Sequence, residues 1–219
     1  MFLPHALTPV GPLAHVLTPQ GKKVLELGCG HGVPGILALL AGAEVHFQDF
    51  NQEVLRQLTM PNVMANLHRL PKASSRPSCR FFAGDWSSVG ELLTNQGLGG
   101  HYDLILTAES IYNPNSQSQL LECIKQVLQP PLGLVMVAAK SYYFGVGGGV
   151  QSFIKAIQYD NLFDVSHAHK TSEDVTHMVT AVDVLPKKPA TPREPKASNG
   201  LYREVLELTF PISIQPYFL

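Results

Sequence analysis

Four acidic residues lie within or directly after apolar segments of the sequence. Asp49, Asp85 and Glu109 come after apolar runs, and Glu26 lies within the run 24–27. A carboxylate accepts hydrogen bonds, so Asp49 suits the two hydroxyls of a ribose and Asp85 suits an adenine amino group. The alternative for each aspartate is a helix cap, because a helical pattern follows both. The spacing of these acids predicts a site for a nucleoside.

Glycines alternate with other residues directly after the first apolar run. Gly28, Gly30 and Gly32 allow the backbone to turn sharply and to lie against a ligand, because glycine tolerates positive φ and has no Cβ. The segment 33–40 then predicts a helix. A strand, a glycine loop and a helix in this order present free backbone N–H groups to a bound small molecule.

Three nucleotide motifs compete for this loop. A Walker phosphate loop requires Gly-Lys followed by Ser or Thr, but Gly32 is followed by Val-Pro. The dinucleotide pattern Gly-x-Gly-x-x-Gly is met from Gly30 to Gly35, which leaves Gly28 unused. The third option, Glu-Leu-Gly-Cys-Gly-x-Gly, resembles the first motif of class I S-adenosylmethionine (SAM) methyltransferases. Glu26 favours this option, because a carboxylate would pair with the cationic amino-acid end of SAM and would repel a phosphate.

Composition sets limits on the class of protein. The chain has 219 residues, which suggests one domain, with 45% hydrophobic residues and a net charge of −1. This balance argues against a general nucleic-acid-binding surface. Cys29, Cys79 and Cys123 form no C-x-x-C pair and the nine histidines are scattered, so we expect no metal site. Reduced thiols, no apolar run of membrane-spanning length and no secretory signal predict a protein of the cytoplasm or nucleus.

Strand-like apolar runs alternate with helical patterns along the chain. After the first strand and helix, we expect strands at 43–49, 79–86, 102–107 and 132–139, and helices at 51–67, 87–94, 116–128 and 150–159. Strand-like residues at 163–169, 178–185 and 201–210 follow without a helix between them. This order predicts an α/β fold with a mainly parallel sheet and one antiparallel strand. Pro61 predicts a kink or a restart within the second helix.

Over residues 21–210 the pattern resembles the seven-stranded SAM methyltransferases. It is closer to the branch that carries Asp/Glu-x-x-Tyr after the fourth strand, which here is Glu109 to Tyr112. Segments 46–51, 58–66, 107–114 and 143–149 are similar to histidine protein methyltransferases that modify a large-subunit ribosomal protein. The resemblance implies a Rossmann-like sheet of seven strands with helices on both faces, SAM as the cofactor, and methyl transfer to a histidine ring nitrogen of a protein substrate.

The residue chemistry and the resemblance together assign a candidate site. The cofactor residues are Glu26, Gly28, Cys29, Gly30, Gly32, Asp49, Asn62, Asp85, Trp86 and Thr107. Trp86 would stack on the adenine ring or open the next helix. Glu109 or the side-chain carbonyl of Asn113 would accept the N–H of the acceptor ring, and Tyr112, with Tyr143 and Phe144, would wall its pocket.

Two other functions remain open at this point. A lysine acceptor would also suit an aromatic pocket with an acid, and a SAM-binding adapter without catalysis would need only the cofactor residues. We divide the chain into an N-terminal cap or truncated extension at 1–21 and a methyltransferase domain at 22–219. Within this domain, the Pro-, Lys-, Ala- and Ser-rich segment 186–200 predicts a flexible loop. We expect a monomer that does not bind nucleic acid directly.

Overall fold

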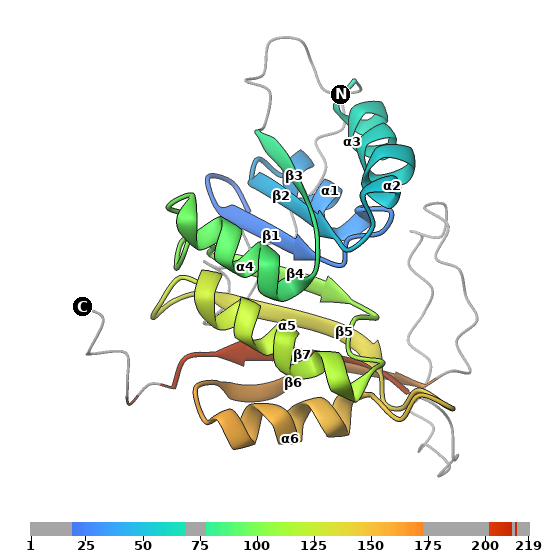
Figure 1. Ribbon diagram of the computed structural model, residues 1–219, viewed down its shortest axis with the longest axis vertical. Coiled ribbons are helices and arrows are strands. Elements are labelled where there is room, and N and C mark those ends of the chain that lie inside the picture. The colour runs from blue at the N-terminus through green and yellow to red at the C-terminus, as the bar shows by residue number, and fades with distance from the viewer. Residues whose placement is uncertain (1–18, 69–77, 173–201, 212, 214–219) are drawn as a thin grey trace, which may run out of the picture.

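The computed structural model describes residues 19–68, 78–172, 202–211 and 213. Seven strands form one sheet in the order β3-β2-β1-β4-β5-β7-β6 (Figure 1). The strands are β1 (Lys23–Leu27), β2 (Glu44–Asp49), β3 (Cys79–Ala83), β4 (Leu104–Ala108), β5 (Leu134–Lys140), β6 (Asp164–Ser172) and β7 (Tyr202–Thr209). β7 runs antiparallel to both of its neighbours, β5 and β6, and the other neighbouring pairs in the sheet are parallel. The predicted mainly parallel sheet with one antiparallel strand is therefore confirmed, whereas the expectations for 178–185 and 186–200 lie outside the described residues.

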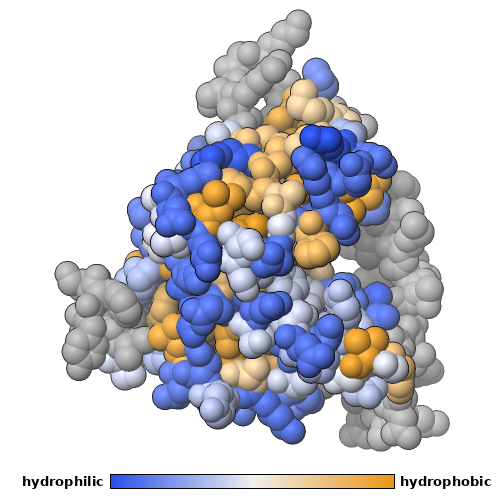
Figure 2. Space-filling model, in the orientation of Figure 1, coloured by the Kyte–Doolittle hydropathy of each residue, from blue (hydrophilic) through white to orange (hydrophobic). Residues whose placement is uncertain are grey.

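Helices cover both faces of the sheet, as predicted. They are α1 (Val33–Leu40), α2 (Gln52–Val54), the π-helical turn η1 (Leu55–Thr59), α3 (Met60–Leu67), α4 (Trp86–Asn95), α5 (Pro114–Val127) and α6 (Val150–Asp160). One hydrophobic cluster joins the sheet to α4, α5 and α6, and a second joins it to α1, η1 and α3. The surface over α4 and α5 is mostly hydrophilic in Figure 2, so these helices bury one face and expose the other. No helix in the described part of the chain combines the length and hydrophobicity needed to cross a bilayer.

The alternation of side chains along β1 separates its core residues from its acid. Leu25 and Leu27 belong to the cluster under α4 to α6, whereas Val24 belongs to the cluster under α1. Because successive side chains of a strand point to opposite faces, Glu26 shares the α1 face with Val24. Strand order reverses between β1 and β4, and in open parallel sheets ligands bind beyond the carboxyl ends of the strands at such a point.

The second helix continues through Pro61 with a change of helix type. Proline has no N–H, so the turn before it lacks one hydrogen bond. The chain adopts the π-helical turn η1 directly before α3, in which Pro61 occupies the first turn. The predicted restart near Met60 therefore appears as a π turn, a feature often found at functional sites. It brings Thr59 against the glycine loop, where the Thr59 hydroxyl donates to the Gly30 carbonyl at 2.6 Å.

Candidate active site

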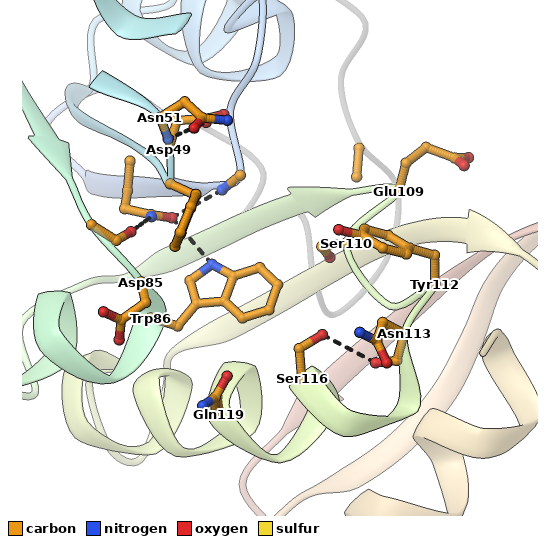
Figure 3. Close-up of a pocket in the computed structure, with 15 residues that line it drawn as sticks. Asp49, Asn51, Asp85, Trp86, Glu109, Ser110, Tyr112, Asn113, Ser116 and Gln119 are labelled. Atoms are coloured by element: carbon orange, nitrogen blue, oxygen red, sulfur yellow. Dashed lines mark hydrogen bonds between the residues drawn. The ribbon is translucent and has the colours of Figure 1, made fainter. Parts of the chain in front are cut away.

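A cavity of about 420 Å³ opens at the carboxyl ends of the central strands. Its lining residues come from the ends of β2 and β4, from the loops after β1 to β4, and from the N-terminal turns of α4 and α5, and Figure 3 shows the labelled ones around a common space. The lining is Gly28, Gln48, Asp49, Phe50, Asn51, Gly84, Asp85, Trp86, Ala108, Glu109, Ser110, Tyr112, Asn113, Ser116 and Gln119. The volume lies within the range of roughly 300–1,000 Å³ that is usual for small-molecule sites.

Asp49 ties the glycine loop to the end of β2. Its Oδ2 accepts the Gly30 N–H at 3.0 Å, and its Oδ1 accepts the Asn51 N–H at 3.0 Å. Gly28, Gly30 and Gly32 all have positive φ, between 51° and 73°, as the predicted sharp turn requires. The carboxylate lies on the cavity wall, where it retains lone pairs for a ligand hydroxyl.

Gln48 is a residue of the site that the sequence analysis missed. Its buried side-chain oxygen accepts the Gly28 N–H at 3.0 Å and the Trp86 indole N–H at 3.2 Å. Its amide nitrogen donates to the Gly84 carbonyl at 2.7 Å. One amide therefore joins the loops after β1 and β3 and holds the indole of Trp86, which is labelled in Figure 3, at the cavity. The available signal was a second polar residue, directly before Asp49, at the carboxyl end of a predicted strand in a mainly parallel sheet.

Several predicted cofactor residues brace the loop from outside the cavity lining. Asn62 donates to the His31 carbonyl at 3.0 Å, and the Thr107 hydroxyl donates to the Leu27 carbonyl at 2.8 Å. The Cys29 thiol lies 3.6 Å from the Thr59 hydroxyl, and burial raises its pKa to about 12, so it is not a reactive thiolate. These contacts shape the loop; a direct contact between these side chains and a cofactor stays a prediction.

Glu26 is buried behind the glycine loop at the start of α1. One of its carboxylate oxygens accepts the Gly35 N–H at 2.9 Å, and a Cβ at Gly35 would lie only 2.5 Å from that oxygen. Desolvation by burial raises the pKa of Glu26 to about 8, against the opposing effect of the Gly35 hydrogen bond. Glu26 is not part of the cavity lining, so its pairing with a cationic ligand end also stays a prediction.

Asp85 and Trp86 follow β3, the neighbour of β2 in the sheet, so they line the cavity on the side of Asp49, across from Tyr112 (Figure 3). Asp85 is the N-cap of α4: its carboxylate accepts from the Ser88 N–H at 2.9 Å and from the Ser88 hydroxyl at 2.7 Å. These hydrogen bonds lower the pKa of Asp85. The alternative role of Asp85 as a helix cap is thus observed. Asp85 also lines the cavity, and its contact with an adenine amino group stays a prediction. Trp86 is the first residue of α4 and also lines the cavity.

A second pocket, of about 470 Å³, adjoins the first at Glu109 and Tyr112, which line both. Its other lining residues are Lys140, Tyr142, Tyr143, Phe144 and Val146. The rings of Tyr112 and Tyr143 are 6.3 Å apart in an edge-to-face arrangement. Glu109 follows β4 with a φ of 56°, which is uncommon for a residue with a side chain, and its side chain is 46% exposed. The carboxylate is therefore accessible where the two pockets meet.

Asn113 lines the first cavity, but its side-chain oxygen has a structural role. Asn113 is the N-cap of α5, and its Oδ1 accepts the Asn115 N–H at 3.0 Å. Of the two groups predicted to accept an N–H from the acceptor, Glu109 lines both pockets, whereas Asn113 lines only the first.

The structure explains why glycines end the segment 143–149. A Cβ at Gly148 would lie 2.1 Å from the carbonyl oxygen of Tyr112, and a Cβ at Gly149 would lie 2.4 Å from the carbonyl oxygen of Ser141. The Gly149 N–H also donates to the Ile111 carbonyl at 3.1 Å. The loop after β5 therefore packs backbone to backbone on the loop that carries Glu109 and Tyr112, and a larger residue would hold the two loops apart.

Metal ligands do not gather within the part of the chain that the structure describes. No group of three or more His, Cys, Asp or Glu side chains there could hold a metal ion.

Comparisons with solved structures place this architecture among SAM methyltransferases. Magnesium protoporphyrin IX methyltransferase of Synechocystis with bound S-adenosylhomocysteine (SAH) matches 91% of this chain and 78% of its own, with a TM-score of 0.53 and 17% identity. A putative RNA methyltransferase of Pyrococcus horikoshii matches 91% of this chain and 81% of its own, with a TM-score of 0.52 and 16% identity. At these identities the likeness shows the fold.

Sequence comparisons are more specific. Histidine protein methyltransferase 1 homologs are similar to this chain: the protein of Bos taurus is 43% identical over 66% of this chain and 43% of its own. The homolog of Dictyostelium discoideum is 38% identical over 77% of this chain and 51% of its own. EEF1A lysine methyltransferase 3 of Mus musculus is 30% identical over 55% of this chain and 46% of its own. The chain spans about half the length of these curated relatives.

A family model described as lysine methyltransferase matches residues 6–158, which include the glycine loop, both carboxylates Asp49 and Glu109, and the segment 143–149. The match extends over more than half of the chain, and the sheet order and the cavity agree with it. The chain therefore belongs to the family described as lysine methyltransferase.

Proposed function

We propose that this protein transfers a methyl group from SAM to a ring nitrogen of a histidine in a protein substrate. The observation that carries the proposal is the junction of two pockets at Glu109 and Tyr112: a polar cavity beside the glycine loop and an aromatic pocket beyond it. A cofactor in the first and an acceptor side chain in the second would meet at this junction. The histidine protein methyltransferase 1 homologs support histidine as the acceptor.

The residues of the first cavity fit SAM. Asp49 offers a carboxylate for the ribose hydroxyls, Trp86 offers an indole face, and Asp85 offers an acceptor for the adenine amino group. Behind the glycine loop, Glu26 provides a buried carboxyl group that would ionise beside the cationic amino-acid end. SAM, when bound, supplies an electrophilic methyl group.

The chain's own residues would position the acceptor. Histidine attacks only as the neutral imidazole, and its unperturbed pKa of about 6.5 allows that at cellular pH. One ring nitrogen attacks and the other carries a proton, so the Glu109 carboxylate accepts that N–H and stabilises the imidazolium as its charge develops. Tyr112, Tyr143 and Phe144 line the pocket in which the ring would lie. The transfer is an in-line displacement, so positioning supplies most of the acceleration.

Product analysis tests this function. The full chain would be incubated with methyl-labelled SAM and ribosomal large-subunit proteins stripped of RNA, followed by complete hydrolysis and amino-acid analysis. We expect label in methylhistidine. Label in methyllysine would favour the second candidate, lysine methylation, which the family description and EEF1A lysine methyltransferase 3 support. SAM binding without transfer would favour an adapter.

Glu26 offers a separate test of how the cofactor is held. The buried carboxyl has a pKa of about 8, so it is mostly protonated at pH 7, and an ammonium group beside it would favour the ionised form. SAM binding at pH 7 is therefore expected to release up to about one proton from Glu26. Calorimetry in two buffers with different ionisation enthalpies measures this release. Glu26→Gln should remove it, whereas Glu91→Gln, on the exposed face of α4, should keep it.

An equal proton release from wild type and Glu26→Gln would mean that Glu26 only braces the start of α1. The cationic end of the cofactor would then be held elsewhere.

The proposal also includes the class of substrate and the cellular compartment of the reaction. Segments 46–51, 58–66, 107–114 and 143–149 resemble histidine protein methyltransferases that modify a large-subunit ribosomal protein. This resemblance supports such a protein as the substrate. The three cysteines are all free, which supports a reducing compartment such as the cytoplasm or nucleus. We propose a monomer that contacts its protein substrate through the aromatic pocket, without direct binding of nucleic acid or membrane.

A further inference from the structure

The hydroxyl of Tyr143 connects the backbone of β5 to the carboxylate of Glu109. It accepts the Lys140 N–H at 3.2 Å and donates to Glu109 Oε2 at 2.8 Å. Lys140 ends β5, and Glu109 follows β4, which is the parallel neighbour of β5 in the sheet. The contact therefore joins two strand ends at the edge where the pockets meet.

Glu109 needs such a contact to hold one orientation. Its φ of 56° places the residue in the left-handed region, and its N–H donates to the Ala138 carbonyl at 2.8 Å. The backbone is thus held in a conformation that costs free energy, as is common at functional sites. The side chain beyond it is long and nearly half exposed, so without a partner it would sample several rotamers.

Arg203, a charged residue near Glu109, makes a looser contact than the Tyr143 hydroxyl does. Arg203 Nε lies 3.8 Å from Glu109 Oε1, which is longer than a hydrogen bond, and the arginine side chain is 66% exposed. An exposed ion pair of this length contributes little orientation. Tyr143 therefore makes the shorter and better directed contact with the carboxylate.

Tyr143 itself is held firmly. Its ring packs against the larger hydrophobic cluster, and its N–H donates to the Gly148 carbonyl at 3.0 Å. The Lys140 ammonium lies 5.8 Å from the centre of the ring. Through Gly148, which packs on the Tyr112 carbonyl, the ring is part of the same backbone assembly that carries Glu109 and Tyr112.

We propose that Tyr143 is a positioning residue: its hydroxyl holds the Glu109 carboxylate in the orientation that receives the N–H of the acceptor ring. The proposal rests on the proposed function and assigns to Tyr143 a role beyond that of a pocket wall. With Oε2 engaged by the hydroxyl, Oε1, which lies 3.8 Å from Arg203 Nε, would be the oxygen that accepts the N–H of the acceptor ring. Burial raises the pKa of Tyr143 to about 12, so the hydroxyl keeps its proton and remains a donor throughout the physiological range.

A double-mutant cycle tests this role. Wild type, Tyr143→Phe, Glu109→Ala and the double variant would be compared in the full chain, by single-turnover transfer from labelled SAM to RNA-free ribosomal large-subunit proteins. Tyr143→Phe is expected to lower the rate about tenfold in the wild-type background but less than twofold in the Glu109→Ala background, because groups that act as a unit are not additive. Tyr159→Phe, which removes the hydroxyl of an exposed tyrosine on α6, is the control.

Equal losses in both backgrounds, or a wild-type rate for Tyr143→Phe, would overturn the proposal. A merely structural role would lower the affinity for SAH and the melting temperature, which are expected to stay close to those of wild type. Tyr143→4-aminophenylalanine keeps the ring and restores a hydrogen-bond donor, so it should recover most of the transfer rate. If Tyr143→Phe folds poorly, this second variant still tests the role of the donor. The wild-type product separately tests the proposed function: methyllysine would refute the histidine acceptor, and the same cycle on that product would still decide the role of Tyr143.

Discussion

Glu109→Gln is expected to lower the rate of methyl transfer by about 10²-fold or more while SAM affinity stays near that of wild type. The substitution keeps the size of the side chain and an acceptor oxygen for the Tyr143 hydroxyl. It removes the negative charge that stabilises the imidazolium, and single electrostatic or acid–base contributors are typically worth this much. The carboxylate lies where the two pockets meet, so its effect should appear in the transfer step.

Single-turnover transfer from labelled SAM measures the rate, and calorimetry measures SAM affinity. Glu91→Gln, which makes the same chemical change on the exposed side of α4, is the matched control and should behave as wild type. Wild-type transfer by Glu109→Gln would remove the carboxylate from the mechanism. A variant that instead loses SAM affinity would make Glu109 a cofactor ligand.

Asp49→Ala is expected to weaken SAM binding by roughly 1.5–3 kcal/mol, the usual contribution of a hydrogen bond to a charged group. Asp49 lines the cavity at the end of β2, where a carboxylate can accept from ribose hydroxyls. The same side chain accepts the N–H groups of Gly30 and Asn51, so part of the loss would come from a looser glycine loop.

A ligand pair separates the two contributions. Calorimetry would compare SAH with an analogue that lacks both ribose hydroxyls, in wild type and in Asp49→Ala. If Asp49 binds the ribose, the substitution should weaken the binding of SAH much more than the binding of the analogue. Equal losses for both ligands would show that Asp49 acts only through the loop, and unchanged affinity would show that the ribose is held elsewhere.

The order of elements followed from local patterns in the sequence. Strand and helix patterns placed Asp49, Asp85 and Glu109 after successive strands, and in a parallel sheet these ends lie along one edge. All three residues do line one cavity. The helix at Val33–Leu40 matched its predicted bounds, and the other elements differ by a few residues at their ends. Such local properties, hydrophobic periodicity and turn residues, are written in consecutive positions and can be predicted without knowledge of the fold.

The sequence alone therefore determined the fold class, the edge of the sheet that carries the cavity, and three of the four predicted acids, Asp49, Asp85 and Glu109, as residues at that edge. The tertiary structure decided what each side chain does there. The Thr107 hydroxyl reaches a carbonyl 80 residues away, Gln48 joins the loops after two different strands, and the glycine at 148 is required by the backbone of Tyr112. The physical reason is that these contacts depend on strand register, on loop packing and on rotamers, which bring together groups that no local pattern relates.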